Sequence, residues 1–266
     1  MGIDRRKFLK IAGVSAVAAA GGKMGFDLLS PGDVDAAVKD IPLTTAKKWG
    51  MVVNMHKMND TILKKCKEVC HSFHNVPDWG DTRIEIKWNW SDTFEHTFTE
   101  QEHEYLSEHL LEKNYYMLCN HCENPPCCRV CPTKATFKRD DGIVVMDPHR
   151  CIGCRFCMAA CPFGARSFNW GDPRKAPEEL NPEFPANPEY PTRTKGVVEK
   201  CNFCAERLAK GQIPACVEAA NNEAEDTLIF GDLSDYNSNV RRALREHYTI
   251  RRKPELGTGP NIYYIV

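Results

Sequence analysis

Cysteine is the residue type in this 266-residue chain that is best suited to do chemistry, and the chain has 14 of them. Most recur at gaps of two or three residues. A disulfide framework separates its cysteines so that each bridge closes a loop, whereas such short gaps gather several thiolates around one metal site. The spacing therefore indicates iron–sulfur clusters rather than disulfides.

The clearest block has the spacing C-x2-C-x2-C-x3-C-P, the pattern of bacterial ferredoxins. It consists of Cys151, Cys154, Cys157 and Cys161, with Pro162 behind them. In such a run three thiolates wrap one [4Fe-4S] cluster, and the fourth thiolate points at a different cluster. Gly153 is expected to let the loop backbone approach the cluster closely.

A second block precedes the first and has a longer middle gap, C-x2-C-x4-C-x3-C-P. It comprises Cys119, Cys122, Cys127 and Cys131. The two blocks are expected to exchange fourth ligands. Cluster A would then be bound by Cys119, Cys122, Cys127 and Cys161. Cluster B would be bound by Cys151, Cys154, Cys157 and Cys131. Cys128 competes for the third position, but only Cys127 leaves the three-residue gap, so Cys128 is expected to be a packed thiol.

A third block, Cys201-x2-Cys204-x11-Cys216, follows Lys200. This order of blocks resembles the four-motif iron–sulfur subunits, the electron-transfer subunits of polysulfide, nitrite, DMSO and formate oxidoreductase complexes. The resemblance runs from about Trp49 to Ala220. In that family the outer motifs pair with each other as the inner motifs do. The resemblance thus implies an α+β fold of two bacterial-ferredoxin-like modules of the bis-[4Fe-4S] type, rich in loops and carrying insertions.

The chain departs from the family pattern at the outer motifs. The first motif keeps only Cys66-x3-Cys70, with Asn75-Val76-Pro77 behind it, and Ala220 stands where the last cysteine of the fourth motif is expected. The family scheme assigns the missing ligands to one cluster, so we expect three clusters instead of four. The third, cluster C, would be bound by Cys201, Cys204, Cys216 and Cys70. Cys66 and Cys128 would bind no cluster, and the vacated site would lie at one end of the electron path.

Three other interpretations of these residues are open. Cys66 with Met58, His56 or Asp60 could still hold a fourth cluster, since non-cysteine ligands occur. The run from Cys66 to His71 is one residue longer than a haem attachment site, C-x-x-C-H. Structural zinc could use two of the C-x2-C pairs, although zinc sites are closed sets of four ligands.

The first residues resemble a twin-arginine export signal. Asp4-Arg5-Arg6-Lys7 precedes an alanine-rich apolar stretch that ends near Ala20. That stretch is shorter than the roughly 20 residues that span a bilayer. We therefore expect export to the extracytoplasmic, periplasmic face of the cytoplasmic membrane, where the protein would be peripheral or anchored by an uncleaved signal.

The order of blocks predicts a division of the chain. Its parts are a signal (1–36), an outer ferredoxin-like module with an insert (37–114 and 196–233), an inner module (115–170), a proline-rich excursion (171–195) and a C-terminal helix and tail (234–266). Within these parts we expect a strand at Trp49–Asn54 and helices around Lys64–His71, near Glu100–Glu112 and over Ser238–Tyr248.

Charge and motif content narrow the function. The formal net charge is -1, so no global basic field favours nucleic acid as a partner. No nucleophile, open metal site or nucleotide loop is evident, and the cysteines are assigned to saturated clusters. The sequence predicts an electron carrier and not an enzyme.

The tail and the signal resemble one branch of the family. The stretch 244–257 is similar to the iron–sulfur subunit DsrO of the Dsr membrane complex of sulfite and sulfate reducers. That resemblance implies electron relay between a multihaem cytochrome c and an integral, quinone-interacting membrane subunit (NrfD/DsrP-like), beside other Dsr subunits. The alternative is an electron-transfer subunit of a molybdenum or tungsten oxidoreductase such as polysulfide reductase.

Overall fold

A three-stranded sheet packs in one core with cysteines of the first and last blocks. The computed structural model describes residues 47–175 and 187–266, so the predicted signal lies outside the described residues. The sheet has the order β8-β1-β9, formed by β1 (Trp49–Asn54), β8 (Leu228–Asp232) and β9 (Ile262–Ile265). β1 runs antiparallel to β8, with Trp49 opposite Asp232, and parallel to β9, with Met51 opposite Ile262. The strand predicted at Trp49–Asn54 is confirmed.

β1 takes the central place because it is a short apolar run that is buried on both faces. Met51 and Val53 face the main core, whereas Val52 packs with Val240 and Ala243 of α11 (Asn239–Glu246). The helix predicted over Ser238–Tyr248 is therefore confirmed, shorter by one or two residues at each end.

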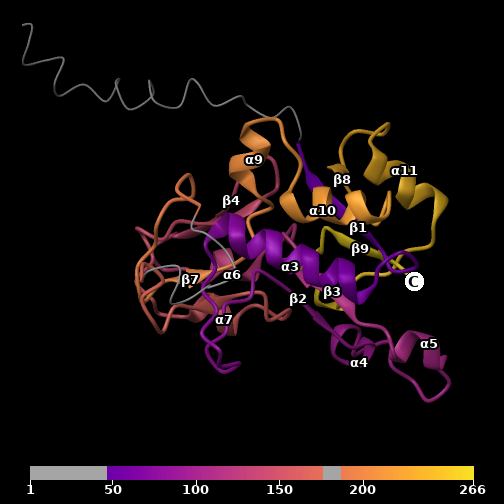
Figure 1. The fold of residues 1–266 in the computed structure, drawn as a ribbon, viewed down its shortest axis with the longest axis horizontal. Coiled ribbons are helices and arrows are strands. Elements are labelled where there is room, and N and C mark those ends of the chain that lie inside the picture. The colour runs from indigo at the N-terminus through magenta and orange to yellow at the C-terminus, as the bar shows by residue number, and fades with distance from the viewer. Residues whose placement is uncertain (1–46, 176–186) are drawn as a thin grey trace, which may run out of the picture. The chain divides into compact units, whose positions relative to one another are not determined.

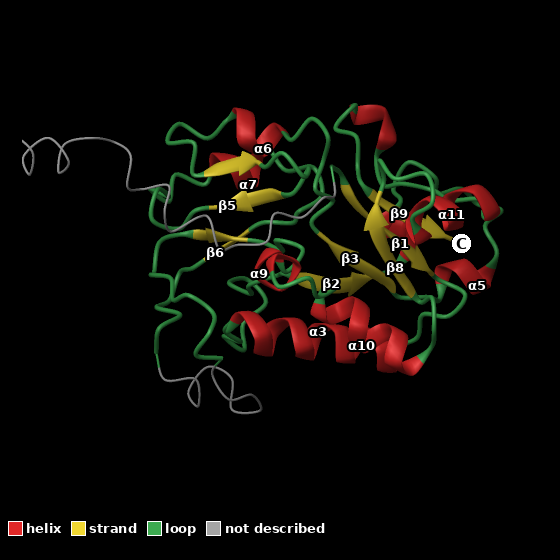
Figure 2. Ribbon diagram, turned by 90° about the horizontal axis from the view of Figure 1, so that it is seen from above, coloured by secondary structure: helices red, strands yellow, loops and turns green. Residues whose placement is uncertain are grey.

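Two helices cover the main core and bring outer cysteines together. α3 (Asp60–His74) and α10 (Ala215–Glu223) lie side by side beneath the sheet in Figure 2. The side chain of Asn59 accepts a hydrogen bond from the Ile62 amide at 3.0 Å and caps α3. Because of this cap, α3 begins four residues before the predicted start at Lys64.

The inner cysteine blocks are built on short elements. These are the hairpin of β4 (Thr136–Lys138) and β5 (Val144–Met146), the strand β6 (Ser167–Phe168), and the single-turn helices α6 (Pro126–Arg129) and α7 (Phe156–Ala159). β6 pairs with β7 (Val198–Glu199), which precedes the third block, and α9 (Ala205–Ala209) follows Cys204 of that block. Figures 1 and 2 place α6 and α7 at the end of the described fold that lies away from β1 and β8, and Figure 2 shows β5 beside them.

The insert before the second cysteine block forms the pair of β2 (Asn89–Asp92) and β3 (Tyr115–Leu118). Two one-turn helices, α4 (Phe94–Thr97) and α5 (Glu108–Leu111), lie between them. The helix predicted near Glu100–Glu112 is therefore wrong over most of its length. α5 buries none of its residues, and an isolated helix without a buried face is marginal in water.

The described residues thus combine helices with several small sheets, as expected for the α+β class. The division into two ferredoxin-like modules stays a prediction. The pairs β2/β3 and β6/β7 join residues that the sequence assigned to different modules. The 3-10 helix η2 (Pro254–Leu256) leads the tail into β9. None of the described helices is long and apolar enough to span a bilayer.

Candidate iron–sulfur centres

The first C-x2-C loop of each of the three blocks that contain one shares a backbone feature. In each of these loops the residue before the second cysteine has a positive φ: 41° at His121, 70° at Gly153 and 57° at Phe203. Left-handed backbone costs a non-glycine residue roughly 1–2 kcal/mol. The equivalent turns indicate three loops built for the same task.

The four thiols predicted for cluster A, called group A, lie close enough to affect one another. Burial, and then the thiols of Cys119, Cys127 and Cys161, raise the pKa of Cys122 to about 12. Burial and the thiols of Cys119 and Cys127 also raise the pKa of Cys161. Group A therefore gathers at one place, as the exchange of fourth ligands requires.

Group C, the four thiols predicted for cluster C, gathers in the same way. Burial raises the pKa of Cys70 well above its ordinary value, and the thiols of Cys204, Cys201 and Cys216 raise it further. Cys70 comes from α3 and Cys216 from α10, whereas Cys201 and Cys204 belong to the loop before α9. Packing of α3 against α10 thus joins the first and last cysteine blocks.

Group B, the four thiols predicted for cluster B, is more open. Burial raises the pKa of Cys157, and the thiols of Cys127 and Cys151 raise it further. Cys154 is exposed. Cys131 lies on a separate turn. Burial raises its pKa, but the Thr133 hydroxyl at 3.6 Å and the amides of Thr136, Ala135 and Thr133 outweigh burial, so its pKa is lowered. Its place in group B stays a prediction.

The two fourth cysteines sit in matching turns. After Cys161, the amides of Ala165 and Phe163 donate to the sulfur, at the same spacing as Ala135 and Thr133 after Cys131. The third residue after each cysteine is left-handed, Lys134 with φ 55° and Gly164 with φ 64°. Amides aimed at a sulfur stabilise thiolate, the form that binds iron.

Electrostatic effects between thiols of different groups indicate the order in which the groups follow one another. Cys157 of group B acts on Cys127 of group A, and Cys119 of group A acts on Cys201 of group C. The rings of His121 and Phe203 stack at 3.7 Å between the group A and group C loops. The order is therefore B, A, C, with group A in the middle.

The two leftover thiols are placed differently. Cys66 lies beside group C, and its thiol donates to the Cys216 carbonyl at 3.4 Å. It is fully buried with Met58 and Ala220 in the main core, whereas His56 and Asp60 are exposed. Cys66 and Ala220, which stand in the incomplete outer motifs, are therefore packed in the main core. Cys128 is half-buried and lies 3.9 Å from the Thr136 hydroxyl.

Three features near the thiols are not apparent from the cysteine pattern. The tail closes over the Cys119–Cys122 loop: the Asn261 side chain donates to the His121 carbonyl at 2.6 Å, and the Asn124 amide donates to the Thr258 carbonyl at 2.9 Å. Arg166 and Lys200 are buried beside the groups. Only Lys200, which directly precedes Cys201, has a sequence position that could have drawn attention to it.

The donor set fits [4Fe-4S] clusters. Within residues 47–175 and 187–266, no three Cys, His, Asp or Glu side chains converge as closely as a single metal ion requires. A cubane cluster lies between its four sulfurs and holds them further apart than one ion does. The geometry gives no support to zinc. Cluster binding would deprotonate the buried thiols, because thiolate is the ligand.

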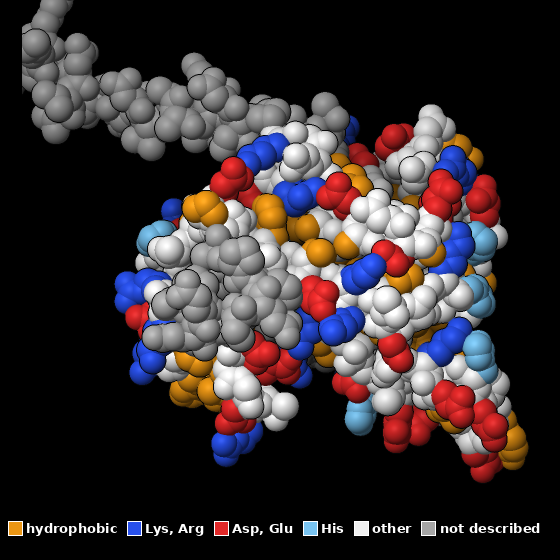
Figure 3. All heavy atoms as spheres, in the orientation of Figure 1, with side chains coloured by type: hydrophobic (Ala, Val, Ile, Leu, Met, Phe, Trp, Pro, Cys, Tyr) orange, Lys and Arg blue, Asp and Glu red, His pale blue; other side chains and the backbone are white. Residues whose placement is uncertain are grey.

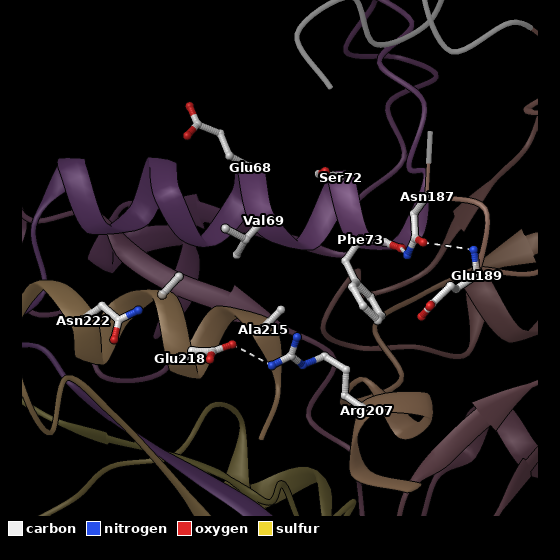
Figure 4. Close-up of a pocket in the computed structure, with 11 residues that line it drawn as sticks. Glu68, Val69, Ser72, Phe73, Asn187, Glu189, Arg207, Ala215, Glu218 and Asn222 are labelled. Atoms are coloured by element: carbon white, nitrogen blue, oxygen red, sulfur yellow. Dashed lines mark hydrogen bonds and ion pairs between the residues drawn. The ribbon is translucent and has the colours of Figure 1, made fainter. Parts of the chain in front are cut away.

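A groove of about 600 Å³ between α3 and α10 contains none of these thiols. Figure 4 shows Val69 and Phe73 of α3 facing Ala215 of α10, with Arg207 bonded to Glu218. Its other carboxylates, Glu68 and Glu189, pair with Lys64 and Lys210. On the face of the protein that Figure 3 shows, Asp and Glu side chains lie among Lys and Arg side chains.

Comparison with known proteins agrees with this chemistry. The family described as "4Fe-4S dicluster domain" matches residues 114–176, a span that contains every cysteine of groups A and B. The iron–sulfur subunit 1 of an Hdr-like menaquinol oxidoreductase from Archaeoglobus fulgidus is 38% identical over 98% of this chain and 97% of its own length.

Two further relatives cover most of both proteins. The iron–sulfur cluster-binding subunit of menaquinone reductase from Nitratidesulfovibrio vulgaris is 33% identical over 82% of this chain and 88% of its own length. The B subunit of polysulfide reductase from Wolinella succinogenes is 36% identical over 83% of this chain and 95% of its own length. The protein therefore belongs to the family of iron–sulfur electron-transfer subunits of redox complexes, which are not the catalytic subunits themselves.

Proposed function

We propose that this protein is the three-cluster electron-transfer subunit of a quinone-linked membrane complex. It would relay electrons between a multihaem cytochrome c and an integral, quinone-interacting membrane subunit. Two relatives are named as subunits of menaquinol and menaquinone oxidoreductases, which supports the quinone link. The resemblance to DsrO supports a role in sulfite or sulfate respiration, and the twin-arginine motif supports an extracytoplasmic location.

The observation that carries the proposal is the continuous order of the thiol groups. Beyond the effect of burial, the group A thiols of Cys127 and Cys119 raise the pKa of Cys157 in group B and of Cys201 in group C, so group A lies near both other groups. A [4Fe-4S] cluster carries one electron at a potential that the protein sets through hydrogen bonds, burial and charge. The chain's own residues supply the thiolates, keep groups A and C buried, and fix the distances along the path.

Group B offers the surface end of this path. Ile152 and Phe156 lie beside its ligands and are 67% and 60% exposed. Arg129, Arg150 and Arg155 are exposed on the same loops. Large apolar side chains that are exposed together mark protein contact sites more often than free surface. We therefore place one redox partner against this patch.

The ligand assignment is tested with one cysteine variant for each group. Cys122→Ala, Cys154→Ala and Cys204→Ala should each lose about four iron atoms and one EPR signal of the reduced protein. Cys66→Ala and Cys128→Ala are matched controls and should keep the iron content of the wild type. Loss of a cluster from either control would overturn the assignment.

The partners are tested by purifying the tagged protein from membranes. Haem c spectra and an integral membrane protein in the purified complex would support the proposal. A large subunit that carries a pterin would instead support the second candidate, a subunit of a molybdenum or tungsten oxidoreductase. The likeness to the B subunit of polysulfide reductase favours that candidate.

A further inference from the structure

Three cations are buried in the described fold without a carboxylate at ion-pair distance, namely Arg166, Lys200 and Arg252. The Nε of Arg252 donates to the Thr97 carbonyl at 3.1 Å, and the two cations beside the thiol groups are Arg166 and Lys200. Arg166 is 5% exposed and Lys200 is 2% exposed. Buried charges are normally paired or coordinated because desolvation is costly. Arg193 follows this rule, with its guanidinium 2.6 Å from the buried Glu199. Among the described residues, no carboxylate lies within ion-pair distance of Arg166 or Lys200.

Arg166 lies between groups A and B. Its Nη2 donates to the Thr136 hydroxyl at 2.6 Å, and its Nη1 lies 3.8 Å from the Met146 sulfur. Met146 packs in one hydrophobic cluster with Cys127 of group A and Cys157 of group B. Burial lowers the pKa of the guanidinium, but these two thiols act in the opposite direction and raise it. The thiols nearest to Arg166 are therefore one predicted ligand from each of two neighbouring clusters.

Lys200 lies between groups A and C. Its Nζ donates to the carbonyl of Val144 and, at 2.7 Å, to the carbonyl of Cys201. The ammonium acts on the thiols of Cys201 in group C and Cys127 in group A. Each junction between groups thus contains one buried cation, and both cations reach group A.

We propose that Arg166 and Lys200 set the cluster potentials at these junctions. This inference rests on the three clusters proposed above. A cubane with four thiolate ligands is anionic, and reduction adds one more negative charge. A fixed cation in a low-dielectric interior stabilises the reduced form more than the oxidised form, which raises the potential. The cations also reduce the repulsion between adjacent anionic clusters.

The geometry predicts a crossed pattern of effects. Arg166 raises the potentials of clusters A and B, and Lys200 raises those of clusters A and C. Cluster A, in the middle, feels both charges. A residue with a purely structural role would change the amount of cluster retained, but it would not produce this pairing of shifts.

The test is an EPR-monitored redox titration of the purified full-length protein. The variants are Arg166→Gln and Lys200→Gln, with Arg166→Lys and Lys200→Arg as charge-keeping controls. Each Gln variant should shift two of the three signals to lower potential. The expected shift is at least tenfold in the equilibrium constant of reduction, which is about 59 mV for one electron. One signal should shift in both variants, and each of the others in one variant only.

Several results would overturn the inference. Unchanged potentials in both Gln variants, or equal shifts of all signals, would exclude junction-specific charge effects. Charge-keeping variants that shift as far as the Gln variants would show that charge is not the cause. If a Gln variant loses clusters, its charge-keeping partner must retain them at wild-type potentials. Wild-type protein without three clusters would refute the proposed function itself, which the iron content reports separately.

Discussion

Backbone conformation at single residues shapes the ligand loops. Gly153 has φ +70°, and a Cβ added there would lie 2.4 Å from the Gly196 carbonyl oxygen. His121 and Phe203 adopt the same conformation with side chains, and their stacked rings help to hold it. The crowding at Gly153 in this structure comes from Gly196, so the glycine serves the packing of two loops.

Gly153→Ala should therefore destabilise the group B loop. The left-handed backbone costs roughly 1–2 kcal/mol, and the clash with Gly196 adds to it. The midpoint of denaturant unfolding and the iron content should both fall. Gly211→Ala is the matched control, because Gly211 has φ +72° but open space around it. An equal effect of the two substitutions would contradict the role given to the clash.

The sequence predicts the cysteine ligands because their spacing is itself the signal, and the ligand assignment stays a prediction. The thiols of groups A and C lie near enough to raise one another's pKa, which is compatible with that assignment. Arg166 and Lys200 could not be assigned in the same way, since a single basic residue has no periodic pattern. Their role depends on which loops meet in space, and only the structure shows that.

At the scale of elements, the tail stabilises the group A loop. β9 completes the outer sheet beside β1, and Asn261 bonds to the loop through its backbone and its side chain. The sequence predicted the tail helix but not β9, because the partner strand lies some two hundred residues earlier in the chain. Local periodicity carries no information about pairing at that separation.

Asn261→Ala removes the donor to the buried His121 carbonyl. Leaving a buried acceptor without its partner costs about 1–3 kcal/mol. We expect a lower unfolding midpoint, together with a broadened or weakened signal of cluster A. Asn237→Ala, at an exposed position of the same tail, should leave both unchanged. An unchanged unfolding midpoint in the Asn261 variant would contradict the stabilisation of the group A loop by the tail.

Position 220, where the family pattern has a cysteine, is buried in α10, which packs against α3. Ala220 and Cys66 are fully buried there, and Met58 is buried beside them. Ala220→Cys would restore one family ligand, but the other missing ligands are still absent from the first motif. The iron content of this variant should equal that of the wild type. A gain of about four iron atoms would show that the position can still hold a cluster.

At the scale of the whole molecule, the path of thiol groups ends at the surface beside Phe156. Phe156→Glu should weaken association with the redox partner, because it places a charge at the centre of an apolar contact. Co-purification should fall while the iron content stays constant. Tyr105→Glu changes an aromatic that is 84% exposed in the insert and serves as the control. Equal loss of partner in both variants would argue against the patch.

The central claim is that one polypeptide holds three [4Fe-4S] clusters and that the fourth family site has been lost as a unit. Quantification of iron and acid-labile sulfide in the pure protein, with EPR of its reduced form, tests that claim most directly. Twelve ligands at four per cluster predict about twelve iron atoms for each polypeptide. About sixteen iron atoms, or only about eight from the dicluster domain, would contradict it.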